Sequence, residues 1–315
     1  MNFFFVIFIS FILFYFLNDY LKNTNILVNY KGQKHQKFLG SKDIPLSGGI
    51  FLAYSIIVLF GYYNFFLSLF IFLIFCVGFA SDTNFLSSPK LRLLIQSSII
   101  ICFVLILDIK INETNFLLLD KLLENIYFRY FFSVFCLLIL INGSNFIDGL
   151  NGLLLGYFSL IISIILYLNS FLYFGIEKNM IVLLLLSLIY LFILNINNKL
   201  FMGDSGSYTL GLISGFFLIK LYEFNDEISP YFIVLLLWYP CFENLFSIIR
   251  KLKSKFSPFT PDNNHLHQLF IQFSLKKKII KNKLAANNIS SIIISLFNFL
   301  IIFISSLNPY SSIYQ

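Results

Sequence analysis

Charged side chains are scarce in this 315-residue sequence: Asp, Glu, Lys and Arg make up 12% of it, whereas 58% of the residues are hydrophobic. One water-soluble core cannot bury so large an apolar fraction, so most of the chain must face lipid. Regular apolar–polar alternation over segments of about ten residues is also lacking, which excludes a membrane β-barrel. The four cysteines lie within apolar runs without CxxC spacing, which predicts small hydrophobic side chains rather than disulfide partners or metal ligands.

Long apolar stretches follow one another along the chain, and a helix needs roughly 20 mostly apolar residues to cross a bilayer. We therefore predict an all-α, polytopic transmembrane helical bundle of about ten helices, forming one integral membrane domain over residues 1–315. The apolar run 47–81 is too long for one crossing and is divided at Gly61–Asn64. The first stretch is kept as a helix, because no basic residue precedes it and no small-residue cleavage site follows it. The predicted spans are 3–20, 47–62, 65–81, 91–108, 128–144, 152–172, 180–196, 207–222, 229–247 and 287–307.

Basic residues are distributed unevenly between the two sets of loops. One set carries 17 of the 22 Lys and Arg residues, and basic loops are retained in the cytoplasm, so this set is predicted to be cytoplasmic and both termini extracytoplasmic. The net charge of +7 is explained by this topology and by attraction to the anionic lipid bilayer, without nucleic acid as a partner. The predicted cytoplasmic loops are about 21–46, 82–90, 145–151, 197–206 and 248–286.

The loop after the third predicted span reads GFASDTNFLSSPKLRLLIQ. Asp82 emerges at the end of one helix, and Ser88 precedes the next helix, whose first turn carries Lys90 and Arg92. Taken alone, these residues are explained by ordinary helix capping and by basic anchors at the membrane interface.

The loop after the fifth span reads NGSNFIDGLNGLLLG, in which Asn142, Asn145, Asp148 and Asn151 recur every three residues. This spacing keeps the polar groups on one side of a helical segment, while the interleaved glycines let a backbone or a ligand approach closely. Helix packing through glycine is the alternative, but it does not account for a ladder of Asn and Asp at a membrane surface. The pattern favours a functional site.

Asp204 stands between Gly203 and Gly206 in NINNKLFMGDSGSYTLG, just before an apolar helix. Capping of that helix would explain an Asp. It would not explain the glycines on both sides or the preceding Phe201. A hard cation such as Mg²⁺, held by one or two carboxylates plus substrate phosphates, fits the pattern better.

The longest basic loop contains KFSPFTPDNNHLHQLF, which places two of the three histidines in the chain, His265 and His267, near Asp262. An HxH pair alone is weak evidence of a site. Beside Arg250 and several lysines, however, imidazole suits recognition of a diphosphate. In the first loop, Gly48 and Gly49 indicate close helix packing as readily as ligand contact.

These segments can meet only if one face of the membrane domain folds into a single cleft. Clustered carboxylates repel one another unless a divalent metal is present, and a metal with few protein ligands keeps positions open for phosphate oxygens. The pattern therefore indicates phosphoryl transfer on a nucleotide diphosphate. A site at the membrane boundary further predicts a lipid phosphate as the acceptor.

Together, the four motif segments resemble the polyprenyl-phosphate N-acetylhexosamine-1-phosphate transferases, which include phospho-N-acetylmuramoyl-pentapeptide transferase and the initiators of O-antigen and teichoic acid synthesis. The resemblance runs from Pro45 to Leu269, about 70% of the chain. The family patterns GFxDDxxxLSPKxRLLxQ, NxxNxxDGxDGL, FMGDxGSxxLG and PDxxHLHHxL resemble the segments 78–96, 142–153, 201–211 and 261–269.

The resemblance implies a ten- or eleven-helix fold in the bacterial cytoplasmic membrane with its active site facing the cytoplasm. Its implied reaction moves a sugar-1-phosphate from a UDP-sugar, expected to be a UDP-N-acetylhexosamine, to undecaprenyl phosphate, with UMP as the other product. This would be the first membrane step of surface polysaccharide or cell-wall glycan synthesis. Because the last motif ends in His-Gln, an initiator of surface polysaccharide is favoured over the muramoyl-pentapeptide branch. The sequence leaves the sugar, the pathway and a homodimer open.

The resemblance also implies residue roles. Asp204 corresponds to the Mg²⁺ ligand, with Mn²⁺ as an alternative ion, and Phe201 to an aromatic residue near uracil. Asn145 and Asp148 correspond to a nucleoside-side motif, Asp82 to the second member of an acidic pair, and His265 and His267 to histidines near the diphosphate. The predicted catalytic residues are Asp82, Asp148, Asp204, His265 and His267. The predicted substrate-binding residues are Asn145, Asn151, Phe201, Lys90, Arg92, Asp262 and Gly203.

Two positions depart from the family pattern: Ser81 replaces the first Asp of the acidic pair, and Asn151 replaces the second Asp of DGxDG. A mechanism in which position 81 deprotonates the lipid phosphate is therefore not supported. A phosphate monoester has a second pKa of about 6, so it is already largely ionised near neutral pH. This favours a single displacement, in which Mg²⁺ on Asp204 bridges the diphosphate and Asp82 and Asp148 position metal or substrate.

The sequence leaves two alternatives open. A homologue that binds lipid phosphate or UDP-sugar without catalysis is motivated by Ser81 and Asn151. A transporter of an anionic solute is the other, although transporters place charges near the bilayer midplane, often in repeated halves, and no internal repeat is present here.

Overall fold

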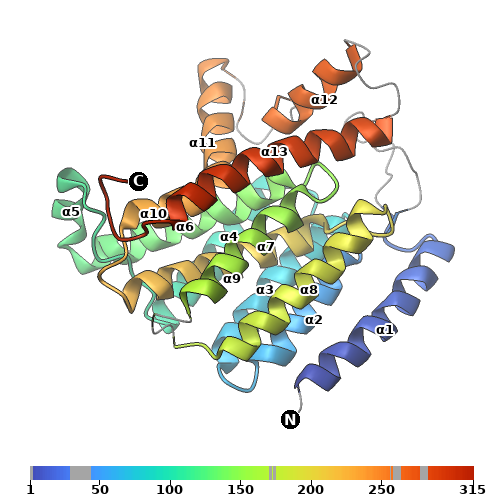
Figure 1. The fold of residues 1–315 in the computed structure, drawn as a ribbon, viewed down its shortest axis with the longest axis horizontal. Helices are drawn as coiled ribbons and strands as arrows, with labels where there is room; N and C mark the ends of the chain where they lie inside the picture. Colours follow the sequence, from blue (N-terminus) through green and yellow to red (C-terminus); the bar gives the residue numbers. More distant parts are fainter. Residues whose placement is uncertain are drawn as a thin grey trace.

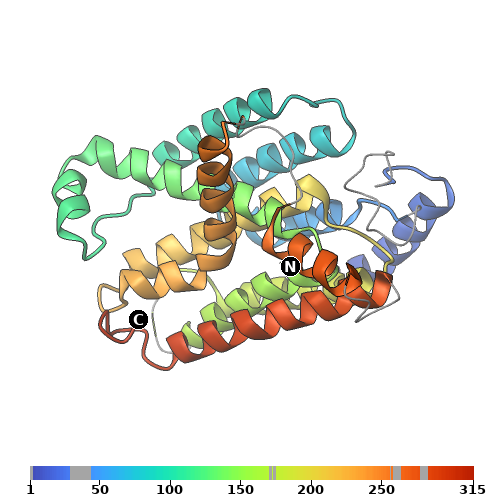
Figure 2. The same cartoon turned by 90° about the horizontal axis from the view of Figure 1, so that it is seen from above.

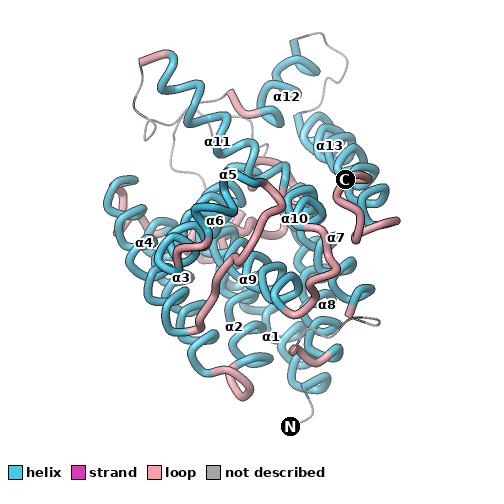
Figure 3. The backbone as a smooth tube through the Cα atoms, turned by 90° about the vertical axis from the view of Figure 1, so that its left-hand side faces the viewer, coloured by secondary structure: helices cyan, strands magenta, loops and turns pink. Residues whose placement is uncertain are grey.

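The computed structural model describes residues 3–28, 44–169, 172, 175–255, 257, 264–276 and 283–315. Within these ranges the chain forms thirteen α-helices and no β-strand, which confirms the predicted all-α fold (Figures 1 and 3). The helices are α1 (Phe3–Asn23), α2 (Gly48–Phe60), α3 (Phe65–Asp82), α4 (Pro89–Ile106), α5 (Leu117–Leu123), α6 (Ile126–Ile147), α7 (Leu153–Leu168), α8 (Lys178–Ile196), α9 (Gly203–Glu223), α10 (Pro230–Leu236), α11 (Trp238–Lys253), α12 (Leu266–Lys276) and α13 (Lys283–Ser306).

Six helices in the described ranges are long and apolar enough to cross a membrane, namely α1, α3, α4, α6, α8 and α13. The helices α2 and α7 are apolar but shorter. Figure 2 places α13 and α4 along opposite sides of the bundle. The chain is therefore a multi-pass membrane protein. The span count of ten and the extracytoplasmic placement of the termini stay predictions.

The predicted division of the apolar run 47–81 is confirmed. The helix α2 ends at Phe60, and α3 begins after Asn64, whose side-chain oxygen accepts the backbone N–H of Leu67 at 2.9 Å. An Asn at this position satisfies one of the N–H groups that a helix start leaves without partners. The turn between the two helices is therefore encoded by local residues.

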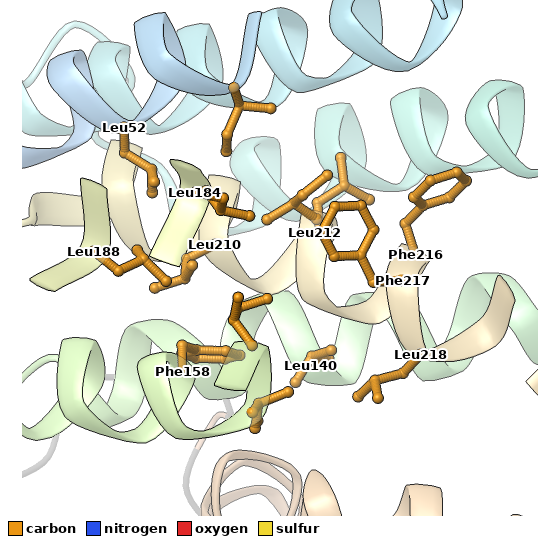
Figure 4. Packing of buried hydrophobic residues seen from close by; sticks show 14 of the residues in the cluster. Leu52, Leu140, Phe158, Leu184, Leu188, Leu210, Leu212, Phe216, Phe217 and Leu218 are labelled. Atoms are coloured by element: carbon orange, nitrogen blue, oxygen red, sulfur yellow. The ribbon is translucent and has the colours of Figure 1, made fainter. Parts of the chain in front are cut away.

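The helix α9 is the centre of the bundle, with α2, α3, α6 and α7 packed around it. Every residue from Ser205 to Ile219 is buried. Small residues make this possible: a Cβ on Gly211 would lie 2.8 Å from the hydroxyl of Ser144 on α6. Figure 4 shows the apolar side chains of α9 packed against those of α2, α6, α7 and α8. Because protein rather than lipid surrounds α9, it carries more Gly and Ser than the outer helices do.

The predicted span 229–247 is not one straight helix but contains α10 and the first part of α11. The chain bends by 76° between α10 and α11. Pro240 has no N–H to donate to the carbonyl of Leu236 four residues earlier, and the hydroxyl of Tyr157 donates to that carbonyl instead, at 2.7 Å. Figures 1 and 3 show α11 projecting beyond the bundle together with α12.

Several predicted loops are partly helical. The helix α6 continues to Ile147, so Asn145 lies in its last turn rather than in a loop, and α9 already begins at Gly203. The predicted loop 248–286 contains the end of α11 and all of α12, and the predicted loop 21–46 includes residues 29–43, which are outside the described ranges. Hydropathy locates spans but does not show such helices between them, because α12 and the end of α11 also carry polar residues.

Candidate active site

The first turn of α9 is held by Asp82, the last residue of α3. Asp82 Oδ1 accepts the backbone N–H of Asp204 at 2.9 Å, and Oδ2 accepts the N–H of Ser205 at 3.1 Å and its hydroxyl at 2.7 Å. The first N–H groups of a helix have no partners within it, and the helix dipole favours a negative charge there. Both oxygens of the buried Asp82 carboxylate are therefore engaged in capping α9.

Glycines allow this close contact between α3 and α9. A Cβ on Gly78 would lie 2.4 Å from the Cα of Ser205, which is closer than backbone atoms tolerate. Gly203 has a φ of +71°, and a Cβ there would meet Asp82 Oδ2 at 2.7 Å. These positions explain two of the glycines in the motifs: one brings the helices together, and the other has a left-handed conformation that disfavours a side chain.

Asp204 follows Gly203 in α9 and is paired with Arg92 of α4. The guanidinium Nη1 lies 2.5 Å from Asp204 Oδ2, and both side chains are about one-fifth exposed, at 22% and 23%. The hydroxyl of Ser81 also donates to Asp204 Oδ2 at 2.5 Å, and Arg92 donates to this hydroxyl in turn. Asp204 is therefore held from α3 and from α4 at once.

Asp148 brings the second motif to the same place. It follows the last residue of α6, and its carboxylate accepts the backbone N–H of Gly203. Burial raises the pKa of Asp148 well above its usual range, and the negative charges of Asp204 and Asp82 raise it further, although the Gly203 hydrogen bond opposes this. Three carboxylates from α3, α6 and α9 are thus electrostatic neighbours.

Asn145, one turn before Asp148, contacts α9 directly. Its side-chain amide donates to the hydroxyl of Tyr208 at 3.4 Å, and its oxygen accepts the hydroxyl of Ser207 at 3.3 Å. Tyr208 is 2% exposed. Asn145 therefore ties the end of α6 to the second turn of α9.

His265 and His267 pack against the end of α6 and the residues just after it. The His265 ring lies 4.7 Å from the Phe146 ring, and a Cβ on Gly149 would lie only 2.1 Å from Nε2 of His267. The two imidazoles stack on each other at 5.8 Å with an interplanar angle of 10°. Gly149 therefore provides the space in which the His267 ring packs.

Comparison with known proteins identifies a family for this chain. Residues 64–222, a segment that contains Asp82, Asp148 and Asp204, match glycosyl transferase family 4. The chain belongs to this family.

Curated relatives carry more specific names. The chain is 27% identical over 262 residues to undecaprenyl-phosphate alpha-N-acetylglucosaminyl 1-phosphate transferase of Escherichia coli O157:H7, covering 79% of this chain and 71% of the relative. It is 30% identical over 216 residues to a probable undecaprenyl-phosphate N-acetylglucosaminyl 1-phosphate transferase of Bacillus subtilis, covering 66% and 58%. A Yersinia pestis relative with the same name as the Escherichia coli protein is 26% identical over 274 residues, covering 82% and 73%.

Some predicted site residues lie away from the cluster that Asp82, Asp148 and Asp204 form. Asn151 is buried among amide side chains: its backbone N–H donates to Asn287 at 2.9 Å and its side chain donates to Asn198 at 2.6 Å. These contacts join the start of α7 to the end of α8 and to α13. Asn151 therefore has a packing role in this structure, whereas its predicted role in substrate binding stays untested.

The remaining predicted residues have varied positions. Phe201 is half-buried. Its backbone N–H donates to the carbonyl of Pro45 at 2.9 Å, and its carbonyl accepts the N–H of Gly48, the first residue of α2, at 3.0 Å. Lys90 is exposed at the start of α4, close in sequence to Arg92. Asp262 lies outside the described residues.

Glu243 of α11 is a site residue that the sequence analysis missed. Its Oε2 lies 3.0 Å from Nδ1 of His265, and its Oε1 accepts the backbone N–H of Leu266 at 2.9 Å. Glu243 is 3% exposed, so this contact is fully inside the protein. The signal was present, because an acidic residue within a predicted span is a functional candidate by itself. Glu243 fixes the ring of His265 and the start of α12.

The clustered carboxylates do not by themselves provide the ligands of a divalent metal. Within the described part of the chain, no group of three or more His, Cys, Asp or Glu side chains is arranged to hold a metal ion. Asp82 uses both oxygens on α9, and Asp204 is paired with Arg92. The described side chains alone therefore do not form a metal site.

We expect acid to destabilise the protein through His267. Burial lowers the pKa of His267 to about 3, and the neighbouring His265 contributes, against an opposing effect of Glu243. An unfolded histidine titrates near 6.5, so the unfolded chain gains a proton below that pH that the folded chain does not bind. Stability should fall as the pH drops from about 6.5 towards 3, by at most about 1.4 kcal/mol per pH unit from this group.

Melting temperatures of the detergent-solubilised protein between pH 7.5 and 4.5 measure this effect. A His267→Asn variant, which cannot titrate at this position, should lose less stability on acidification than the wild type. Equal pH dependence of the two proteins would show that His267 does not carry the effect.

Proposed function

We propose that this chain transfers a sugar-1-phosphate from a UDP-sugar to undecaprenyl phosphate, giving a polyprenyl diphosphosugar and UMP. The observation that carries the proposal is the convergence of Asp82, Asp148 and Asp204 at the first turn of α9, in a multi-pass membrane protein of glycosyl transferase family 4. The names of the relatives support undecaprenyl phosphate as the acceptor and N-acetylglucosamine 1-phosphate as the group transferred.

The proposed reaction is a single displacement. An oxygen of the lipid phosphate attacks the β-phosphorus of the donor, and the bond between that phosphorus and the bridging oxygen breaks, so that UMP leaves with the bridging oxygen. A phosphate monoester is largely dianionic at neutral pH, so the attack needs no strong base. This is consistent with Ser81, which cannot act as a carboxylate base at its position.

The residues of the cluster would bind and position the two anionic substrates. Arg92 offers a planar guanidinium suited to phosphate oxygens. His265 is oriented by Glu243 and lies beside Phe146, while His267 packs against Gly149 just after α6. The cap that Asp82 forms on α9 keeps Asp204 in a defined position.

The position of the carboxylates at the ends of membrane helices also supports the proposal. The carboxylates lie where α3, α6 and α9 begin or end, so a soluble donor could reach them while the tail of the acceptor stays in hydrocarbon. The excess of basic residues in one set of loops supports the cytoplasmic face for this site. We propose the bacterial cytoplasmic membrane as its location.

The test is an assay of UMP release by the purified, detergent-solubilised protein. The protein is incubated with undecaprenyl phosphate, Mg²⁺ and a panel of UDP-sugars, beside reactions that lack the lipid. UMP release with UDP-N-acetylglucosamine that requires the lipid would support the transferase and its donor, and release with another UDP-sugar would reassign the donor.

Two outcomes would contradict the proposal. Release of UMP without the lipid would indicate hydrolysis of the donor rather than transfer. A folded protein that binds UDP-sugar but releases no UMP with any donor would indicate a non-catalytic binding protein, the alternative that Ser81 motivates.

A further inference from the structure

A buried asparagine of the first helix contacts the segment that leads into α9. Asn18 of α1 is 5% exposed, and its side-chain amide donates to the carbonyl of Lys199 at 3.0 Å. Its Oδ1 accepts the hydroxyl of Ser47, the residue before α2. A buried amide is costly without partners, and polar side chains of membrane helices find them on neighbouring helices. These two bonds therefore fix how α1, at the edge of the bundle in Figure 1, docks beside α2 and α8.

Lys199 is contacted by α1 a second time. Its ammonium lies 5.1 Å from the centre of the Tyr15 ring, within the range of a cation–π interaction. Tyr15 stands three residues before Asn18, so both side chains lie on the same face of the helix. The backbone carbonyl and the side chain of Lys199 are therefore both held by α1.

The next residues of this segment are held by other helices. The carbonyls of residues 200–202 accept, in chain order, the side-chain amide of Asn195 and the backbone N–H groups of Gly48 and Gly49, at 3.0, 3.0 and 3.2 Å. All four carbonyls of residues 199–202 thus have a hydrogen-bond partner, and the first of these partners comes from α1. Because the segment between α8 and α9 forms no helix, these contacts set its path.

We propose that Asn18 is a positioning residue of the active site, which fixes residues 199–202 and with them the place of Phe201, the aromatic residue expected beside the nucleotide base. Asn18 acts through the carbonyl of Lys199, two residues before Phe201. It lies outside residues 64–222, the segment that matches the family. The first helix therefore contributes to the site without carrying a motif residue.

Loss of the Asn18 amide should affect substrate binding more than turnover. Asp204 is held by Asp82 and Arg92, whose contacts with it do not involve α1. The position of Phe201, in contrast, depends on the path of the segment before α9. Binding that is lost equally in the ground state and the transition state raises KM and leaves kcat unchanged. In this respect the inference rests on the proposed function, because a UDP-sugar is taken as the substrate.

The test compares Asn18→Leu with Asn23→Leu, the same change at another position of α1. Asn23 is exposed, and its amide donates to Asp19 within the same helix, so the control leaves the contacts between helices in place. Hydrogen exchange of the purified, full-length proteins is followed by mass spectrometry in peptides that cover residues 198–206, with peptides of α13 as a reference. UMP release gives kcat and the KM for UDP-N-acetylglucosamine.

Asn18→Leu should exchange about tenfold faster than the wild type over residues 198–206, because the segment loses a buried hydrogen bond and opens more often. The α13 peptides should exchange as in the wild type. The KM for UDP-N-acetylglucosamine should rise about tenfold while kcat stays close to its wild-type value. Asn23→Leu should match the wild type in both measurements.

Unchanged exchange over residues 198–206 in Asn18→Leu would overturn the inference. So would faster exchange in all peptides, which indicates a general loss of stability, or a local increase in exchange with an unchanged KM. If Asn18→Leu does not elute as a folded protein in size-exclusion chromatography, Asn18→Ala, which needs no additional space, is measured with the same expectations. A wild type that releases no UMP would contradict the proposed function; the exchange data and the affinity for UDP, measured by calorimetry, would then decide this inference.

Discussion

Replacing Asp204 with Asn should lower the rate of UMP release by about two to three orders of magnitude, the usual cost of removing one group that stabilises charge in an active site. The substitution keeps the shape of the side chain and keeps the backbone N–H that donates to Asp82, so the start of α9 should remain folded. What is lost is the negative charge that pairs with Arg92.

The matched control is Asp226→Asn. Asp226 is exposed and lies just beyond the far end of α9, so the same chemical change is made at the opposite end of the same helix. This variant should keep wild-type activity. If Asp204→Asn stays within threefold of the wild-type rate, Asp204 has no essential part in the reaction.

The second large effect is expected for Asp82→Asn, in both activity and stability. The carboxylate accepts three hydrogen bonds from Asp204 and Ser205, whereas an Asn offers one oxygen and turns a donor group towards the remaining N–H. A buried polar group left without a partner costs about 1–3 kcal/mol. Because Asp82 also sets the position of Asp204, we expect turnover to fall by about a hundredfold, the scale of an active-site group misplaced by an ångström.

The comparison variant is Ser205→Ala, which removes one donor to Asp82 and leaves both backbone hydrogen bonds in place. Its melting temperature should fall less than that of Asp82→Asn. Measurements of melting temperature and UMP release on both variants test whether Asp82 acts by positioning α9. An Asp82→Asn protein with a lowered melting temperature and near wild-type turnover would separate the cap from catalysis.

The membrane class and most helix positions could be predicted because they depend on neighbouring residues. The break between α2 and α3, for example, follows from Gly61–Asn64 and from the Asn64 cap. The bend before α11 could not be predicted from hydropathy, because it depends on Pro240 together with Tyr157, which lies 83 residues earlier in the sequence.

In the candidate site, too, some features could be predicted from the sequence and others could not. Motif composition indicated that Asp82, Asp148, Asp204 and the histidines belong to one site, and the structure places them at neighbouring helix ends. Composition could not indicate that Asn151 packs among amides of α8 and α13. It also could not indicate that Glu243 orients His265.

By itself, the sequence determined that this chain is a helical membrane protein and which polar residues stand at the ends of its apolar segments. Hydrophobic burial and helix capping act over a few neighbouring residues, so a linear sequence displays them directly. Only the tertiary structure decided which partner each polar group has: that Asp82 caps α9, that Arg92 neutralises Asp204, and that Gly149 accommodates His267. These pairings join residues more than 100 positions apart, and they depend on how closely the helices pack, which glycine positions such as Gly78 control through their missing side chains.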